Sequence, residues 1–285
     1  MKTDFPETLS ESIEYFSNED NAFRFIRAMR WADGVAVCPI CASKESYVLA
    51  ARRMWKCKGC AKQYSVKVGT IFEDSPLSLG KWMSGFWLIA NAKNGISSYE
   101  THRALGVTQK TAWFMLQRIR LAMQNGTIVK MGGTVEADET FIGGKARNMH
   151  FGKRKVKGTG PVAMTPVMGL LERTTAKGAS RVVLKVAPTT RKGDLQGNVR
   201  EYVLKGSEVH TNGLENFWSL LKRTIKGTYV SVEPFHLFRY LDEQAFRFNE
   251  RKDNDQGRFL KAIAGIVGRR LTYKALIGNA DALPA

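Results

Sequence analysis

The sequence predicts an α/β fold that follows a small metal-binding ribbon and a helical segment. Three observations lead to this prediction. All four cysteines lie in one short stretch near the N-terminus. Residues 77–125 then repeat their apolar side chains with a helical period. Runs typical of strands begin only after Gly126, at residues 133–142, 166–172 and 181–186, and helical periods return after Asp194.

These patterns divide the chain into four parts. They are a helical lead-in at residues 1–34, a zinc ribbon at 35–72, a helix-turn-helix-like segment at 77–125 and an α/β domain at 133–275. We expect residues 1–125 to unfold separately from the α/β domain. The first part carries Phe16, Phe23 and Ile26 on an apolar face, and residues 5–32 are predicted to be helical.

The charge of the chain is strongly positive and unevenly distributed. The formal net charge is +18 and the sequence pI is about 9.9. Residues 51–130 hold thirteen lysines and arginines against three acids, whereas residues 1–20 hold six acids and one lysine. A regional excess of this kind favours a nucleic-acid partner, although a basic but otherwise ordinary surface is the alternative. No apolar run is long enough for a membrane helix and no signal peptide is recognisable, so we expect no membrane partner and a cytoplasmic location.

The four cysteines form two C-x₂-C pairs, with fifteen residues between the pairs. This spacing is typical of a zinc ribbon, in which each tight turn directs two thiolates at one ion. Gly59 suits a turn that uses a left-handed backbone. Buried reduced cysteines or disulfides are the alternatives. We predict one structural Zn²⁺, whose ligands are Cys38, Cys41, Cys57 and Cys60.

Residues 96–120 have the pattern of a helix-turn-helix. Gly106 ends the first helix and Thr108 caps the second. The second helix of such a pair can lie in the major groove of DNA. An ordinary helical hairpin is the alternative. The polar side chains predicted to contact DNA are Lys110, Gln117, Arg118 and Arg120.

Two acidic stretches suggest chemistry. On a strand, Glu136 and Asp138 share one face, opposite Val135 and Ala137, and carboxylates on a core strand are costly unless they hold a metal. An edge strand with a wet face is the alternative. Further on, Glu215 opens a helix and Lys222 follows two turns later on the same side. An acid that complements the helix dipole would also explain Glu215.

A third stretch, at residues 236–251, reads as a long amphipathic helix. Its arginines can either contact DNA or pair with Asp242 and Glu243 on the same helix.

Taken together, these stretches resemble a known family. The segments VEADETFIGGK, HTNGLENFWSLLKR, KGTY and FRYLDEQAFRFNER are very similar to motifs of bacterial insertion-sequence transposases of the DDE class, in the branch with an N-terminal zinc ribbon. The resemblance covers nearly the whole chain. It implies a ribonuclease-H-like catalytic domain and catalytic Mg²⁺. It also implies double-stranded DNA as the partner, both transposon terminal inverted repeats and target DNA, bound by a homo-oligomer.

The resemblance also implies roles for single residues. Asp138 matches the first catalytic carboxylate and Glu215 the last, and both would hold Mg²⁺. Lys222 matches the basic residue that follows the glutamate. Lys153, Arg154 and Lys155, in a basic loop, are further candidates for DNA contact.

The match breaks at the middle aspartate of the family. Asn212 stands where that aspartate is expected, and it already lies within the segment HTNGLENFWSLLKR, which contains the last catalytic glutamate of the family. We therefore expect an internal deletion near residues 205–212 and an incomplete α/β domain. An asparagine offers a carbonyl oxygen but no charge, so a two-metal site would lose several kcal/mol of attraction, on the order given by Coulomb's law at short range.

We consider three hypotheses for the function. In the first, the chain is a metal-dependent transposase that cleaves and joins DNA and is impaired in this copy. In the second, it is a catalytically inactive remnant that still binds DNA, for example as a repressor. A zinc-ribbon transcription regulator is the third, but it would not need the two long acidic motifs.

Overall fold

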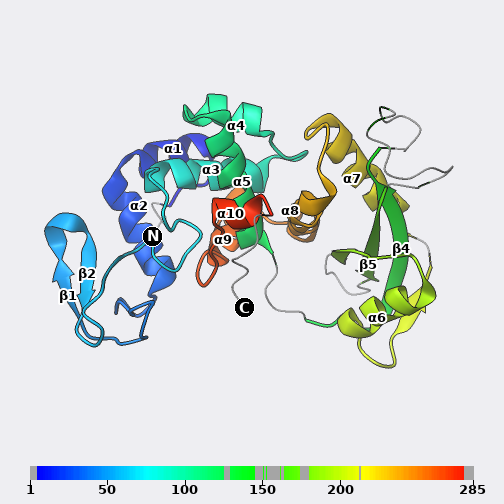
Figure 1. Cartoon of the computed structure of the whole chain (residues 1–285), viewed down its shortest axis with the longest axis horizontal. Helices are drawn as coiled ribbons and strands as arrows, with labels where there is room; N and C mark the ends of the chain where they lie inside the picture. The colour runs from blue at the N-terminus through cyan, green and yellow to red at the C-terminus, as the bar shows by residue number, and fades with distance from the viewer. Residues whose placement is uncertain are drawn as a thin grey trace. The chain divides into compact units, whose positions relative to one another are not determined.

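A computed structural model describes residues 5–124, 129–144, 150, 152, 161, 164–173, 180–211 and 213–278 (Figure 1). The helices are α1 Leu9–Ser17, α2 Glu19–Arg30, α3 Leu79–Asn91, α4 Ser98–Leu105, α5 Gln109–Met123, α6 Lys192–Tyr202, α7 Glu215–Gly227, α8 Leu237–Asn249, α9 Asp255–Ala264 and α10 Tyr273–Leu276. The strands are β1 Ser46–Leu49, β2 Met54–Cys57, β3 Gln63–Ser65, β4 Thr134–Ile142, β5 Thr165–Arg173, β6 Arg181–Val186 and β7 Glu208–His210. Among these described helices, none has both the length and the apolar character that crossing a membrane requires.

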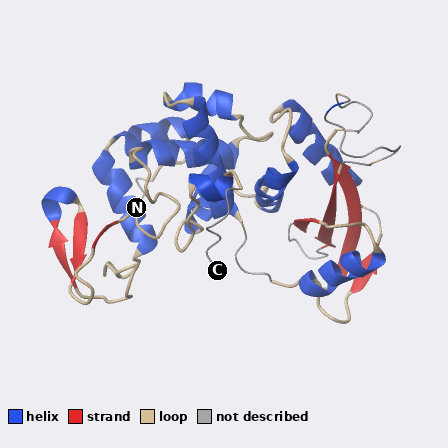
Figure 2. Cartoon of the chain, in the orientation of Figure 1, coloured by secondary structure: helices blue, strands red, loops and turns tan. Residues whose placement is uncertain are grey.

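The described chain forms two compact units. The first unit comprises the described residues of 1–92, 96–123 and 254–285, and the second those of 93–95 and 124–253. The predicted order of ribbon, helical segment and α/β domain is confirmed (Figure 2). The end of the chain differs from the prediction, because residues after 253 belong to the first unit rather than to the α/β domain.

The reason for this difference is an aromatic cluster. Phe259 of α9 is fully buried, and its ring centroid lies 5.0 Å from that of Trp87 on α3 and 5.9 Å from those of Phe16 and Phe25. Phe5 completes the group at 6.3 Å from Phe259. Helix α9 therefore packs against α3 and completes the aromatic core of the N-terminal helices.

The helical lead-in consists of the two helices α1 and α2. Asn18 has an extended backbone and its side chain accepts a hydrogen bond from the N–H of Asp20, so it caps α2 and separates it from α1. Thr8 and Glu11 form a capping box at the start of α1. Both helices turn an apolar stripe inward, where Phe16 and Ile26 are buried.

The second unit is built on a four-stranded sheet in the order β6-β5-β4-β7. The strand pairs β4–β5 and β5–β6 are antiparallel, whereas β7 runs parallel to β4. Strand β7 is short, and its pairing aligns Glu136 with His210. Asp138 thus lies on β4 just beyond the point where β7 ends.

Helices cover both faces of this sheet. On one face Val135, Met168 and Val203 form a core with the apolar side chains of α6. On the other face, α7 and α8 contribute Trp218 and Leu241 to a second core. Alternation along β4 then turns Glu136 and Asp138 toward α7, as predicted from the period of the strand.

We predict that Phe259→Ala destabilises the first unit by about 3–5 kcal/mol, because truncating a buried phenylalanine removes its contacts and leaves a cavity. Calorimetry of the full chain should show a lower Tm for the same transition that zinc removal lowers. Phe235→Ala is the matched control, because Phe235 is 56% exposed in the second unit, and it should shift neither transition noticeably. A Phe259→Ala effect on the other transition would contradict the assignment of α9 to the first unit.

Candidate functional site

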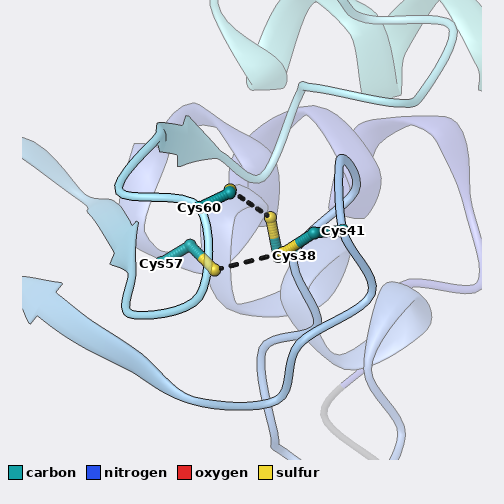
Figure 3. Close-up of side chains that lie close together, drawn as sticks. All are labelled: Cys38, Cys41, Cys57 and Cys60. Atoms are coloured by element: carbon teal, nitrogen blue, oxygen red, sulfur yellow. Dashed lines mark hydrogen bonds between the residues drawn. The ribbon is translucent and has the colours of Figure 1, made fainter.

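The four cysteines converge as the spacing predicted (Figure 3). One sulfur from each lies within 4.8 Å of the others. The Sγ atoms of Cys38 and Cys60 are 3.7 Å apart, and those of Cys41 and Cys57 are 3.4 Å apart. A tetrahedral Zn²⁺ with Zn–S bonds of about 2.3 Å needs sulfurs about 3.8 Å apart. The four thiols therefore fit a structural zinc ion in both chemistry and spacing.

The two turns that hold the thiols are alike. The backbone N–H of Cys38 donates to the carbonyl of Ser43, and that of Cys57 donates to the carbonyl of Lys62. The left-handed positions are Ala42 and Ala61, each directly after the second cysteine of its pair, at φ values of 59° and 57°. The expectation that Gly59 supplies the left-handed backbone is wrong, because the turn reverses two residues later.

The local hydrogen bonds prepare a thiolate. The backbone N–H of Cys60 points at the sulfur of Cys57 and, with neighbouring donors, lowers the pKa of that thiol to about 6. For Cys41 the backbone N–H of Ser43 lowers the pKa, but hydrogen bonds with the other thiols raise it to about 12. Zinc must therefore displace a proton to bind all four sulfurs, and its affinity falls as the pH falls.

The ribbon is attached to the first unit by stacked rings. Trp55 of β2 is buried between Tyr64 of β3 and Phe23 of α2, whose ring centroids each lie 6.0 Å away. Trp31 meets Trp55 edge-on at 4.9 Å. The three antiparallel strands, in the order β1-β2-β3, thus share a core with α2.

Helices α4 and α5 form the predicted helix-turn-helix. Ser97 and Glu100 make a capping box at the start of α4, and Gly106 ends it with a φ of 60°. Thr108 accepts a hydrogen bond from the N–H of Thr111 at the start of α5. Lys110, in the first turn of α5, is exposed.

Three residues predicted to contact DNA are not on the surface. Gln117, Arg118 and Arg120 are 0%, 5% and 1% exposed. Helix α5 runs through the centre of the first unit and is packed by α3, α4 and α9, so its second half has no solvent-facing side. The prediction that these three side chains contact DNA is therefore wrong, because they are polar residues of the protein interior.

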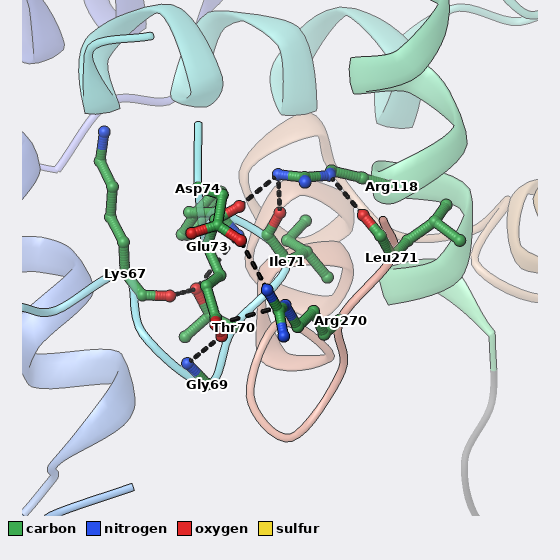
Figure 4. Close-up of polar contacts among 10 residues, drawn as sticks. Lys67, Gly69, Thr70, Ile71, Glu73, Asp74, Arg118, Arg270 and Leu271 are labelled. Atoms are coloured by element: carbon green, nitrogen blue, oxygen red, sulfur yellow. Dashed lines mark hydrogen bonds and ion pairs between the residues drawn. The ribbon is translucent and has the colours of Figure 1, made fainter. Parts of the chain in front are cut away.

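Arg118 shows what such an internal residue does (Figure 4). Its guanidinium donates to the carbonyls of Ile71 at 2.9 Å, Glu73 at 2.8 Å and Leu271 at 3.0 Å. Beside it, Arg270 pairs with Glu73 at 3.2 Å and with Asp74. The two arginines join the loop after the ribbon to the C-terminal segment, and this segment also pairs along Thr70 and Val267.

In the second unit, Asp138 is held by α7. Its Oδ2 accepts a hydrogen bond of 2.7 Å from the indole Nε1 of Trp218, and its Oδ1 accepts from the N–H of Glu139 at 2.8 Å. Trp218 is 5% exposed and lies one turn after Glu215. This bond fixes the start of α7 against the middle of β4.

The two other acids of this region also have protein partners. Glu136 accepts two hydrogen bonds from Arg173, at 2.9 and 3.0 Å. Its carboxylate also packs so closely on Gly213 that a Cβ there would lie 1.9 Å from Oε2. Glu215 accepts from the N–H of Gly213 at 3.0 Å.

Lys222 is exposed on α7 beyond Glu215, as the seven-residue spacing predicted. Asn212 lies outside the described residues, as do Lys153, Arg154 and Lys155. Their predicted roles stay predictions.

No group of three acidic side chains marks a Mg²⁺ site among the described residues. Carboxylate oxygens suit Mg²⁺, and Asp138 and Glu215 offer them from neighbouring elements. Within the described part of the chain, however, the four cysteines are the one group of three or more metal-ligand side chains close enough to share an ion.

Of the two alternatives for the arginines of α8, internal pairing is found for Arg247. Arg247 forms an ion pair with Glu243 one turn earlier, and Glu243 is fully buried. The hydroxyl of Tyr229 also donates to Glu243. Burial lowers the pKa of Arg247, but the coulombic attraction of Glu243 outweighs this effect and raises the pKa, so Arg247 stays charged in the core.

Sequence reasoning missed the roles of Trp218 and Arg173, which bind Asp138 and Glu136. The indole N–H of Trp218 was the available signal. Arg173 carries no local signal, because Glu136 is distant in the sequence.

Comparisons with known proteins agree with these features. A family described as "Transposase zinc-ribbon domain" matches residues 17–63. One described as "ISXO2-like transposase domain" matches residues 130–215 and 205–249. The chain belongs to the ISXO2-like transposases with an N-terminal zinc ribbon. The mixed α/β second unit is consistent with the ribonuclease-H-like domain of DDE transposases.

One relative of this transposase is "Uncharacterized protein in transposable element ISH50" from Halobacterium salinarum. It is 26% identical over 252 residues, which cover 74% of this chain and 84% of the relative. No solved structure matches the chain.

We predict one zinc per transposase chain, lost in Cys57→Ser and released as the pH falls, because protons compete with Zn²⁺ for the thiolates. Metal analysis at neutral pH and during acid titration measures both effects. Ser43→Ala, which keeps all four thiols, should retain the metal. Full zinc occupancy in Cys57→Ser would contradict the four-cysteine site.

We predict that Trp218→Phe destabilises the second unit by about 1.5–3 kcal/mol, because Asp138 loses a hydrogen bond to its charged group. The measurement is calorimetry of Trp218→Phe, Asp138→Ala and the double variant. Trp218→Phe should cost clearly less in the Asp138→Ala background. Equal costs in both backgrounds would show that ring packing, rather than the hydrogen bond, explains the loss.

Proposed function

We propose that this transposase binds the ends of its insertion element, and that its cleavage and strand-transfer activity is impaired. Asp138 and Glu215 are the proposed first and last catalytic carboxylates, and Lys222 is the proposed basic residue near the DNA. The chain would act as a homo-oligomer on duplex DNA. A copy that holds element ends without joining them would act as a repressor of active copies.

The observation that carries the proposed impairment is the state of the acids between β4 and α7. Asp138 is bound by Trp218, Glu136 by Arg173 and Glu215 by Gly213. Each of these protein donors uses part of the acceptor capacity of a carboxylate that a metal would otherwise bind. A metal at this place would have to compete with at least three hydrogen bonds and with the cation of Arg173.

The connection from β7 to α7 supports the same proposal. Strand β7 ends at His210 and α7 begins at Glu215, so only residues 211–214 lie between them. The transposase-domain family matches residues 205–215 in both of its segments. The two matched segments of the family's domain therefore overlap on the same residues of this chain. We expect such an overlap if the residues that normally separate the two segments, including the middle aspartate, have been deleted.

DNA binding is supported by the first unit. The net charge of +18 favours a polyanion. The start of α5 is the part of the helix-turn-helix that remains accessible, and in this motif the N-terminal residues of the second helix reach the bases. Lys110 is therefore the one residue of the four predicted on this helix that stays a proposed DNA contact.

The test is a pair of assays on the full chain, with duplex DNA carrying the ends of its own element. We expect binding by fluorescence anisotropy that weakens when a chelator removes zinc. We expect no nicking or joining with Mg²⁺ or Mn²⁺ beyond the level of Asp138→Ala. Activity that Asp138→Ala abolishes would overturn the proposed impairment, and absence of binding would overturn the proposed DNA partner.

A further inference from the structure

We propose that the DNA-contacting surface of the first unit is shared by two distant parts of the chain: the first turn of α5 and the C-terminal helix α10. This inference rests on the proposed DNA binding and names the residues that would carry it. The new contacts are Tyr273 and Lys274, which follow the whole second unit in the sequence.

The first argument is accessibility. From Ala112 onward α5 is mostly buried, so DNA can reach this helix only at its first turn. Whatever lies beside that turn must also face the DNA. The neighbour there is α10, because the ring of Tyr273 meets that of Phe114 edge-on at 5.7 Å.

The second argument is charge. The ammonium of Lys110 lies over the ring of Tyr273, 4.7 Å from its centroid. Lys274 is the next residue on α10 and is exposed. On the other side of the turn, the exposed Lys81 of α3 donates to the carbonyl of Gly106 at 3.4 Å. Three elements thus bring lysines around the start of α5.

The neighbouring acid does not cancel this charge. Asp74 is exposed near the same place and shares Arg270 with Glu73. Arg118 also attracts both acids, so two arginines balance the two acids. The surface therefore keeps a net positive charge, as phosphate contacts require.

The third argument is open space. A pocket of about 230 Å³ lies between the two helices, bordered by Lys110, Thr111, Phe114 and Tyr273. Tyr273 is itself 36% exposed. The ring holds the ammonium of Lys110 by a cation–π contact, and an ammonium has three donors, so it can still bind a phosphate from this position.

The arrangement also gives a role to the polar contacts that hold residues 270–271 against the rest of the first unit. Arg118 and Arg270 tie residues 70–74 to Leu271 and its neighbours, only a few residues before Tyr273. The position of α10 beside α5 is thereby fixed before any DNA arrives.

The experiment measures affinity for element-end DNA against salt concentration, using the full chain. Lys274→Ala should weaken binding and lower the slope of log K against log salt by about one, the value for one lost phosphate contact. Lys274→Arg, which keeps the charge, should restore the slope. Tyr273→Ala should weaken binding about two- to fivefold, whereas Tyr273→Phe, which keeps the ring, should not.

Three controls make the outcome decisive. Zinc content should be unchanged in each variant, and Tm should be unchanged in the two Lys274 variants, since Lys274 is exposed. Tyr273→Phe, which keeps the ring contact with Phe114, is the folding control for Tyr273→Ala. Lys205→Ala removes an exposed lysine of the second unit and should leave the slope unchanged; an equal loss there would show that only total charge matters and would overturn the inference. Normal binding by Lys274→Ala together with weakened binding by Lys110→Ala would overturn the inference and leave the proposed function standing. A wild-type chain that binds no DNA would overturn both.

Discussion

The burial of α5 is the constraint on which the first unit depends. A helix at the centre of a unit must satisfy its polar side chains inside the protein. Arg118 does so with three backbone carbonyls, two from the loop after the ribbon and one from Leu271. The ribbon, the helix-turn-helix and the C-terminal segment are therefore parts of one structure, and the helix can present only its first turn to a partner.

In the second unit, the corresponding constraint is that the carboxylates of β4 and α7 need hydrogen-bond donors. A sheet with helices on both faces brings β4 and the start of α7 together, and the indole of Trp218 joins them through Asp138. Arg173 and the backbone of Gly213 engage the neighbouring carboxylates. The carboxylates that this fold brings together are thus stabilised by hydrogen bonds from protein groups.

The sequence allowed the zinc site and the faces of β4 to be predicted, because both follow from local spacing. Two C-x₂-C pairs define a tetrahedron of sulfurs, and a period of two places Glu136 and Asp138 together. The fate of Gln117, Arg118 and Arg120 could not be predicted in this way. A helical period shows that two faces differ, but not that both are covered, and the partners of Arg118 lie near residues 71 and 271. The assignment of α9 failed for the same reason, since nothing near Phe259 indicates that its ring meets Phe16.

The first unit also has a consequence for the order in which the protein matures during synthesis. Domains made early in the chain usually fold as they leave the ribosome. Here the rings of Phe16 and Trp87 pack against Phe259, so the hydrophobic surface of the early helices stays uncovered until α9 has been translated. Contacts between such distant residues slow folding. Nascent chains that stop before Phe259, and therefore also lack the second unit or part of it, would thus expose this surface.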